Sequence, residues 1–237
     1  MMSQHNFDVE KVIARSPWFK NLPKEQQAIL VKHSKVEMIE ANSYLFSVGQ
    51  STSHLYCVLS GWIRASVNSA YGDEFALNDL HEGSWAGEAS LYNDLPRVID
   101  LQAKEDSWVL KVPRAAVIRA GEAYPLMYRD ISQFQVARTR GVFELLAGMV
   151  LYPLKSRLAG RMLAMAHEFG ETVENGVAIP QKMSQTDLAR LCVGSRQRVN
   201  KILRDWSARG IIAHEGDFYV ITNMDALAEE VEVTEGE

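Results

Sequence analysis

The chain has 237 residues, of which 47% are hydrophobic and 23% are charged, and its formal net charge is −5. This composition is that of an ordinary soluble globular protein, and the length allows one large domain or two smaller ones. No apolar stretch is long enough for a membrane span, and residues 1–20 lack the pattern of a signal peptide. We therefore expect a cytoplasmic protein with no membrane partner.

The chain has two cysteines, Cys57 and Cys192, far apart in the sequence. They support neither a disulfide framework nor a metal-binding spacing, and they are too few to hold an iron–sulfur cluster. The six histidines are scattered and no His-x-His motif occurs, so a cupin-type metalloenzyme would lack its ligands. We expect no catalytic residue, no metal site and no enzymatic activity.

Charge is unevenly distributed along the chain. Residues 153–210 carry 10 Lys and Arg against 5 Asp and Glu, whereas residues 211–237 carry no basic residue and 8 acidic ones. The basic block indicates an anion-binding face, and a merely solvated basic surface is the alternative. The acidic end, EEVEVTEGE, is typical of a disordered tail.

The first forty residues are predicted to be helical. FDVEKVIA places Phe7, Val12 and Ile13 on one side of a helix, SPW breaks it, and LPKEQQAILVKHS resumes the pattern. From Val36 to Val112 the pattern changes to short runs rich in β-branched and aromatic residues, such as HLYCVLSGWIRASV and SWVLKV. Such closely spaced runs, without helices between them, predict an antiparallel sandwich or jelly roll.

Three helical segments are expected next. PRAAVIRAGEAYP predicts a short helix closed by Gly121 and Pro125, and a proline-free stretch of about 26 residues predicts a long helix that ends at Pro153. The long helix must bury its apolar stripe against the β domain, a second copy of itself, or both. LKSRLAGRMLAMAHEFG predicts a helix that stops at Gly170, followed by a polar loop ETVENG and a short strand VAIP. The stripe consists of Met127, Ile131, Phe134, Val142, Leu145 and Met149.

The most specific motif is MSQTDLARLCVGSRQRVNKILRDWSARGII, residues 183–212. Ser184 and Asp187 resemble a capping box for a helix from about Gln185 to Leu191, CVG makes a turn, and a second capped helix follows. IIAHEGDFYVIT then has the pattern of a hairpin. Together these segments predict a winged helix-turn-helix, and a helical hairpin that merely packs is the alternative. The second helix would be capped by Ser195 and would bury Val199, Ile202, Leu203 and Trp206.

This order of segments resembles the CRP/FNR family of bacterial transcription regulators, from about Trp18 to Thr222. PWFKNLP, YLFSVGQ, LYCVLSGWIRA, the segment G-E-x7-P-R and SRQRVNKIL occur in the family's order and spacing. The resemblance implies a homodimer formed by the long helices, with an effector pocket in each β domain. It also implies double-stranded DNA as the ligand of the winged helix-turn-helix and RNA polymerase as the protein partner.

The expected fold class is α+β, with an antiparallel β jelly roll, a long dimerisation helix and a C-terminal winged helix-turn-helix domain. A helix-turn-helix glycine usually falls one position before Gly194, at Val193, so the turn geometry is expected to differ slightly. The expected domains are a cyclic-nucleotide-binding-like effector domain at 1–126, the long dimerisation helix at 127–152, the winged helix-turn-helix domain at 153–225 and an acidic tail at 226–237.

The resemblance assigns the DNA-reading residues. The first arginine of the family's reading helix binds guanine and maps onto Arg196, whose guanidinium can donate two hydrogen bonds to guanine O6 and N7. The next position is often glutamate but is Gln197 here, and because an amide suits adenine better, the half-site should differ at that pair. Lys201 stands at a second basic contact position. The expected set is completed by Arg198, Arg204, Ser184 and Gln185, which would position phosphates, and by Ser195.

In cyclic-nucleotide-binding members the G-E-x7-P-R segment is the phosphate-binding cassette. The family's roles fall on Glu88, which would meet a ribose hydroxyl, and on Arg97, which would meet the cyclic phosphate. Gly87 precedes Glu88 in the same turn. The alternative is that Arg97 only forms a structural bridge to Glu88 or Asp100.

Three departures from the family affect the effector. Val98 replaces a hydroxyl residue after the arginine, and Val142 and Phe143 stand near two hydroxyl positions on the long helix. Losing three polar contacts of about 0.5–1.5 kcal/mol each would greatly weaken cyclic AMP binding. A cAMP-like cyclic nucleotide, a different small ligand and a pocket closed by its own side chains all stay open, and no other cofactor is expected. A cyclic-nucleotide-binding signalling module without a transcriptional role is the alternative function, although such a module has no use for a winged helix-turn-helix.

Overall fold

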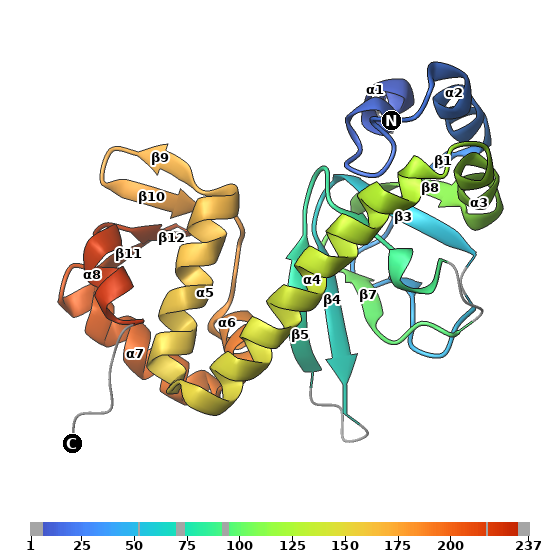
Figure 1. Ribbon diagram of the computed structural model, residues 1–237. Helices are drawn as coiled ribbons and strands as arrows, with labels where there is room; N and C mark the ends of the chain where they lie inside the picture. Colours follow the sequence, from blue (N-terminus) through green and yellow to red (C-terminus); the bar gives the residue numbers. More distant parts are fainter. Residues whose placement is uncertain (1–6, 52, 70–73, 92–94, 217, 232–237) are drawn as a thin grey trace. The chain divides into compact units, whose positions relative to one another are not determined.

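The computed structural model divides into two compact units, Met1–Gly141 and Val142–Glu237. One helix, α4 (Leu126–Leu151), begins in the first unit and ends in the second (Figure 1). Within the described residues, no helix is both long enough and apolar enough to cross a bilayer. The residues that the structure describes are 7–51, 53–69, 74–91, 95–216 and 218–231.

The described part of the first unit contains two four-stranded antiparallel sheets. The strands are β1 (Lys35–Ile39), β2 (Tyr44–Phe46), β3 (His54–Ser60), β4 (Ile63–Asn68), β5 (Glu74–Leu80), β6 (Trp85–Ala86), β7 (Asp100–Ala103) and β8 (Ser107–Pro113). One sheet has the order β1-β8-β3-β6 and the other the order β2-β7-β4-β5. The predicted antiparallel β fold is confirmed, and the two-residue strand β6 is an addition to it.

Strand β3 is buried on both faces because its side chains alternate between two apolar clusters. Tyr56 and Val58 belong to the cluster formed by residues of both sheets. Leu55, Cys57 and Leu59 belong to a second cluster, which includes residues of the helices. Burial on both faces is the reason why the segment HLYCVLS is a nearly continuous apolar run.

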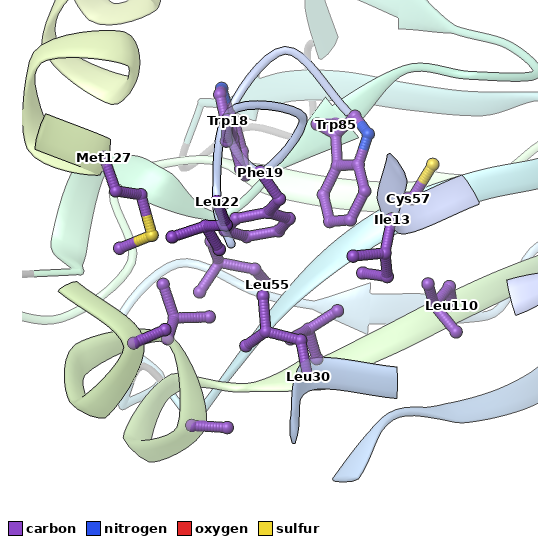
Figure 2. Packing of buried hydrophobic residues seen from close by; sticks show 14 of the residues in the cluster. Ile13, Trp18, Phe19, Leu22, Leu30, Leu55, Cys57, Trp85, Leu110 and Met127 are labelled. Carbon is purple, nitrogen blue, oxygen red and sulfur yellow. The ribbon is translucent and has the colours of Figure 1, made fainter. Parts of the chain in front are cut away.

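Helices α1 (Val9–Arg15), α2 (Lys24–His33) and α3 (Arg114–Ala123) contribute to the second cluster, together with the first turns of α4. Figure 2 shows the side chains of Trp18, Phe19 and Trp85 together in this cluster. The Trp18 ring centroid lies 5.2 Å from that of Trp85 and 5.3 Å from that of Phe134 on α4. These aromatic contacts fix the start of α4 against the β domain.

The predicted end of α3 at Gly121 is wrong, because the helix continues to Ala123. Gly121 lies inside the helix, where a Cβ atom would come within 2.5 Å of the ring of Tyr128. The glycine therefore serves close packing, and the helix ends just before Pro125, whose ring disfavours helical geometry in the preceding residue.

The described part of the second unit contains helices α5 (Leu154–Phe169), α6 (Gln185–Cys192), α7 (Arg196–Ala208) and α8 (Met224–Glu229). Its strands are β9 (Glu171–Val173), β10 (Gly176–Ile179), β11 (Ile212–Glu215) and β12 (Phe218–Ile221), in the sheet order β11-β12-β10-β9. The segment ETVENG, predicted to be a polar loop, instead forms strand β9 and the turn to β10. A hairpin of this kind needs only a tight turn and a backbone partner, so its exposed polar side chains give no strand signal.

The acidic C-terminal segment is more ordered than expected. Residue 226, the predicted start of the tail, lies inside α8, and Glu230 is buried. The Glu230 carboxylate forms an ion pair with Lys155 and accepts a hydrogen bond of 2.5 Å from Arg209 Nη1. The prediction of disorder is therefore wrong for residues 229–230, while residues 232–237 lie outside the described part. The other predicted domain boundaries stay predictions.

Candidate functional site

Two side-chain caps define the helix-turn-helix. The Ser184 hydroxyl accepts a hydrogen bond of 3.1 Å from the Asp187 backbone N–H, and the Ser184 N–H donates to the Asp187 carboxylate at 3.0 Å. This reciprocal pair is the predicted capping box of α6. Ser195 caps α7 by accepting from the Arg198 N–H at 3.3 Å. The beginnings of both helices are therefore fixed by residues close to them in the sequence.

Helix α7 separates a buried apolar face from an exposed polar face. Of the four residues predicted for the inner face, Val199, Leu203 and Trp206 are buried and Ile202 is half-buried. Five polar side chains of the same helix are exposed, and within the described residues no protein side chain is hydrogen-bonded to them. These five are Arg196, Gln197, Arg198, Lys201 and Arg204. The helix thus presents free donors and acceptors of the kind that reads base edges and phosphates.

The turn between α6 and α7 contains a strained valine. Val193 has φ 51° and ψ 55°, the left-handed conformation that a β-branched residue rarely adopts. Gly194 keeps an ordinary φ but packs tightly, because a Cβ atom there would come within 2.6 Å of Leu154 Cδ1. The expected departure in turn geometry is therefore specific. Gly194 packs against the Leu154 side chain, which would have to move for a larger residue, and the left-handed position falls on Val193.

Two further features complete this region. The Gln185 side chain donates a hydrogen bond of 3.1 Å to the Asn200 side chain, so a residue expected to contact phosphate also links α6 to α7. Strands β11 and β12 pair antiparallel from Ile212↔Ile221 to Glu215↔Phe218, and Gly216 in their turn has φ 61°. The predicted wing is therefore present, while Asp217 of its turn lies outside the described residues.

The cassette of the first unit is centred on the buried guanidinium of Arg97. Its Nη1 donates to the Gly87 carbonyl at 2.8 Å, its Nη2 donates to the His54 carbonyl at 2.6 Å, and its Cζ lies 4.1 Å from the ring centroid of Phe46. Gly87 has φ 102°, and a Cβ atom there would come within 3.2 Å of Arg97 Nη1. A glycine is required for both the turn and this close approach.

Burial lowers the pKa of Arg97, and the nearby Tyr56 and Glu88 act in the opposite direction. Arg97 Nε is buried and has no hydrogen-bond partner. A buried guanidinium bound by two carbonyls and an aromatic ring keeps its positive charge without a carboxylate to neutralise it. The Nε donor of this buried cation is therefore left without a partner.

Arg138, a residue of α4 that the sequence analysis did not single out, holds Glu88. Arg138 Nη1 lies 2.7 Å from Glu88 Oε1, and its Nη2 donates to the Trp85 carbonyl at 2.8 Å. Glu88 Oε2 is buried and has no hydrogen-bond partner. The sequence carried a signal for this residue: Arg138 continues the apolar stripe of the long helix, because residues 127, 131, 134 and 138 are spaced by four, three and four.

The alternative in which Arg97 forms a structural bridge is wrong for both proposed partners. Glu88 pairs with Arg138, and Asp100 accepts hydrogen bonds of 2.8 Å from the Val48 N–H and from the Asn68 side chain. In the described part of the chain no ion pair joins Arg97 to a carboxylate. Arg97 and Glu88 lie in one cassette, but each has a different partner.

The apolar residues expected near the effector are exposed. Val98 is 68% exposed and carries no group that could bond a phosphate. Val142 and Phe143 lie on α4 in the second unit and are 49% and 66% exposed. Their contact with a ligand therefore stays a prediction.

Neither cysteine is suited to redox sensing. Burial raises the pKa of Cys57 to about 12 and that of Cys192 to about 12. Both thiols are thus protonated at neutral pH, and a thiol reacts far more slowly than a thiolate. Among the described residues no group of three or more His, Cys, Asp or Glu side chains could hold a metal ion.

The fold and these two sites define a regulator with a cyclic-nucleotide-binding-like β domain and a winged helix-turn-helix. Residues 36–124 match the family model of the cyclic nucleotide-binding domain, and residues 156–230 match that of the Crp-like helix-turn-helix domain. The two models together cover more than half of the chain. The chain belongs to the CRP/FNR family and is a DNA-binding transcription regulator.

Relatives in several bacteria cover most of the chain. The CRP-like cAMP-activated global transcriptional regulator of Mycobacterium tuberculosis is 23% identical over 220 residues, which are 93% of this chain and 98% of the relative. The anaerobic regulatory protein of Bacillus subtilis is 22% identical, over 86% of this chain and 87% of the relative. The solved structure of FixK2 from Bradyrhizobium japonicum matches with a TM-score of 0.77 at 16% identity, over 85% of this chain and 98% of that one.

Proposed function

We propose that the protein is an effector-responsive regulator that binds near-palindromic promoter sites as a homodimer. The observation that carries this proposal is the exposed polar face of α7, which a buried apolar face and the Ser195 cap hold in place. In a dimer two such helices would enter successive major grooves, about 34 Å apart. RNA polymerase is the protein partner that we propose for such a regulator.

Sequence selectivity can be tested by selecting sites from randomised DNA. We expect Arg196 to specify guanine and Gln197 to favour adenine, because their side chains match those base edges. The Gln197→Glu variant should change the preferred base at one position of each half-site, since a carboxylate accepts from cytosine N4. An unchanged preference would contradict the assignment of Gln197. Binding should also weaken steeply with salt, because several exposed cations would neutralise phosphates.

The exposed apolar residues of α4 support a homodimer. Its second half exposes large side chains, with Val150 82% and Phe143 66% accessible on the single chain. A stripe of this kind is buried when two copies of a helix pair. Sedimentation of wild type and Leu146→Glu should give a dimer and a weakened or monomeric species, respectively. The matched control is Glu144→Gln, a substitution at an exposed polar position of the same helix, and it should leave the dimer intact.

For the effector we propose a small ligand that has both an anionic group and a hydrogen-bond donor. Arg97 Nε is a buried donor without a partner, and Glu88 Oε2 is a buried acceptor without one. A ligand with both groups would satisfy both atoms and would offset their desolvation. Val98 supplies no hydroxyl, so a ligand that relies on that contact binds less well than in relatives that have it.

Calorimetry with cyclic AMP, cyclic GMP and a buffer control tests this proposal on the full-length protein. Heat that corresponds to a Kd below about 10 μM would identify a cyclic nucleotide as the ligand despite Val98. The Arg97→Ala variant should abolish that heat. Binding that survives this substitution would show that the guanidinium does not hold the anion.

A further inference from the structure

We propose that Arg157 is a positioning residue that ties the end of the long helix to the helix-turn-helix and thereby sets the reading helix α7. The inference rests on the proposed function, because it concerns how sequence-specific DNA binding is maintained. Arg157 lies in the first turn of α5, on a different helix from the residues of α7 that are predicted to read bases. The three carbonyls that its guanidinium contacts belong to the second unit, as Arg157 itself does.

The Arg157 guanidinium binds the C-terminal ends of two helices at once. Its Nη1 donates to the Tyr152 carbonyl, just after α4, at 2.7 Å. Its Nε donates to the Cys192 carbonyl at the end of α6 at 3.0 Å, and its Nη2 donates to the Val193 carbonyl in the turn at 3.2 Å. Carbonyls at helix C-termini lack partners within their own helix and carry partial negative charge. One cation therefore satisfies three of them.

The turn that Arg157 holds has little freedom to move without changing α7. Val193 is held in a left-handed conformation that costs a β-branched residue energy, and a side chain at Gly194 would require the Leu154 side chain of α5 to move. Helix α7 begins two residues later, at Arg196. A shift of the turn carbonyls would therefore shift the residues predicted to read bases.

Lysine cannot reproduce this arrangement. A guanidinium has five N–H donors in a planar fork, whereas an ammonium is a single point of charge on a flexible stem. The Arg157→Lys variant keeps the charge and most of the side-chain volume, but its single nitrogen cannot take the three positions of Nε, Nη1 and Nη2 from which Arg157 reaches the carbonyls. Arg157→Gln is a second variant that keeps hydrogen-bond donors and removes the charge.

The experiment compares specific and non-specific DNA binding by the full-length protein. Fluorescence anisotropy gives the Kd for a site selected by wild type and the Kd for random-sequence DNA of the same length. Because Arg157 lies on α5 and not on the reading helix α7, we expect Arg157→Lys to weaken specific binding about tenfold and to change non-specific binding less than about twofold. Arg119→Lys, an exposed arginine of α3, is the matched control and should change neither value.

Hydrogen exchange supplies a second readout, which a general loss of stability would not reproduce. The Tyr152 N–H donates to the Gly148 carbonyl, and the Gly194 N–H donates to the Ala189 carbonyl. Both amides should exchange faster in Arg157→Lys, while amides of the β domain keep their wild-type rates. Faster exchange at only one of these two amides would contradict the inference that Arg157 ties the end of α4 to the helix-turn-helix.

Three binding results would contradict the inference. Unchanged specific binding in both Arg157 variants overturns it, as does an equal loss of specific and non-specific binding, which a merely structural role predicts. Failure of wild type to select any site would overturn the proposed function itself and this inference with it. The last result is distinguishable because it appears before any variant is tested.

Discussion

The helix-turn-helix and the cassette use arginine in opposite ways. Arg196 on α7 is exposed, and within the described residues its side chain has no hydrogen-bond partner. Arg97 in the cassette is buried under an aromatic ring and bound by two backbone carbonyls, and its pKa is lowered by burial. The first arginine is free to meet a partner that arrives from solvent, whereas the second forms part of the fold.

This difference determines what a substitution would change. A side chain on an exposed face contributes to binding and little to folding, because water already surrounds it in the free protein. A buried charge contributes to both binding and folding, since removing one member of a buried pair leaves the other without compensation. Variants at the cassette should therefore lose stability, and variants on α7 should lose affinity alone.

The largest expected effect is at the cassette. Arg138→Met leaves the buried Glu88 carboxylate without its cation, so the free energy of unfolding should fall by about 3 kcal/mol. Urea denaturation measures the change. The double variant Glu88→Gln/Arg138→Met should lose less than the sum of the single losses, because the uncompensated charge is gone. Arg140→Met, an exposed position on the same helix, is the control. Equal losses at 138 and 140 would contradict a stabilising pair.

The next effect is on DNA binding at α7. Arg196→Ala should weaken binding to the selected site by about 1–3 kcal/mol, because two hydrogen bonds to guanine are lost. Its free energy of unfolding should stay within about 0.5 kcal/mol of wild type, since the side chain is exposed. Anisotropy and urea denaturation on one preparation supply both values. A loss of stability equal to the loss of affinity would remove the distinction between the two regions.

Glu230 gives a pH-dependent test within the second unit. Burial opposes its ionisation, but the hydrogen bonds from Lys155 and Arg209 outweigh this effect and lower its pKa. Because the folded pKa is lowered, the unfolded chain binds the proton more tightly, so this stability is present above the ordinary carboxyl pKa and is lost as pH falls through the lowered one. Glu230→Gln should therefore destabilise the protein by about 1–2 kcal/mol at neutral pH.

The difference between wild type and Glu230→Gln should shrink as the pH falls below the ordinary carboxyl pKa and through the lowered pKa of folded Glu230, where the carboxyl becomes protonated in both states. Urea denaturation at each pH measures it. Glu229→Gln, at the exposed neighbouring position, should show no such dependence. A pH-independent difference would mean that Glu230 acts by packing and not by charge.

The smallest expected effect is a gain in stability. Val193→Gly removes the cost of the left-handed conformation, which favours the folded state. Glycine also adds freedom to the unfolded chain, which opposes this gain, so we expect a net stabilisation of about 1 kcal/mol. Thermal denaturation should show a higher Tm. Gly210→Ala places a side chain at another residue with positive φ, 68°, and should lower the Tm instead. A lower Tm for Val193→Gly would show that the turn carries no strain.

The sequence by itself determined the features that depend on short-range rules. Helix caps act over three residues, apolar spacing follows the helical period, and β alternation has a period of two, so Ser184, Ser195 and the buried face of α7 could all be predicted. The jelly roll and the long helix followed from the same patterns. Strand β9 could not be predicted, because a partner strand decided it, and neither could the role of Gly121, which packs against the Tyr128 ring inside α3 while the predicted Pro125 ends the helix.

Only the tertiary structure decided which charges meet. Arg138 reaches Glu88 across 50 residues of chain, Arg97 reaches the His54 carbonyl across 43, and Arg157 reaches the Cys192 carbonyl across 35. No local rule selects such partners, because the energy of a charge contact depends on burial, and burial is a property of the folded chain as a whole. The sequence could name the residues of the cassette, but the fold determined that each has a different partner.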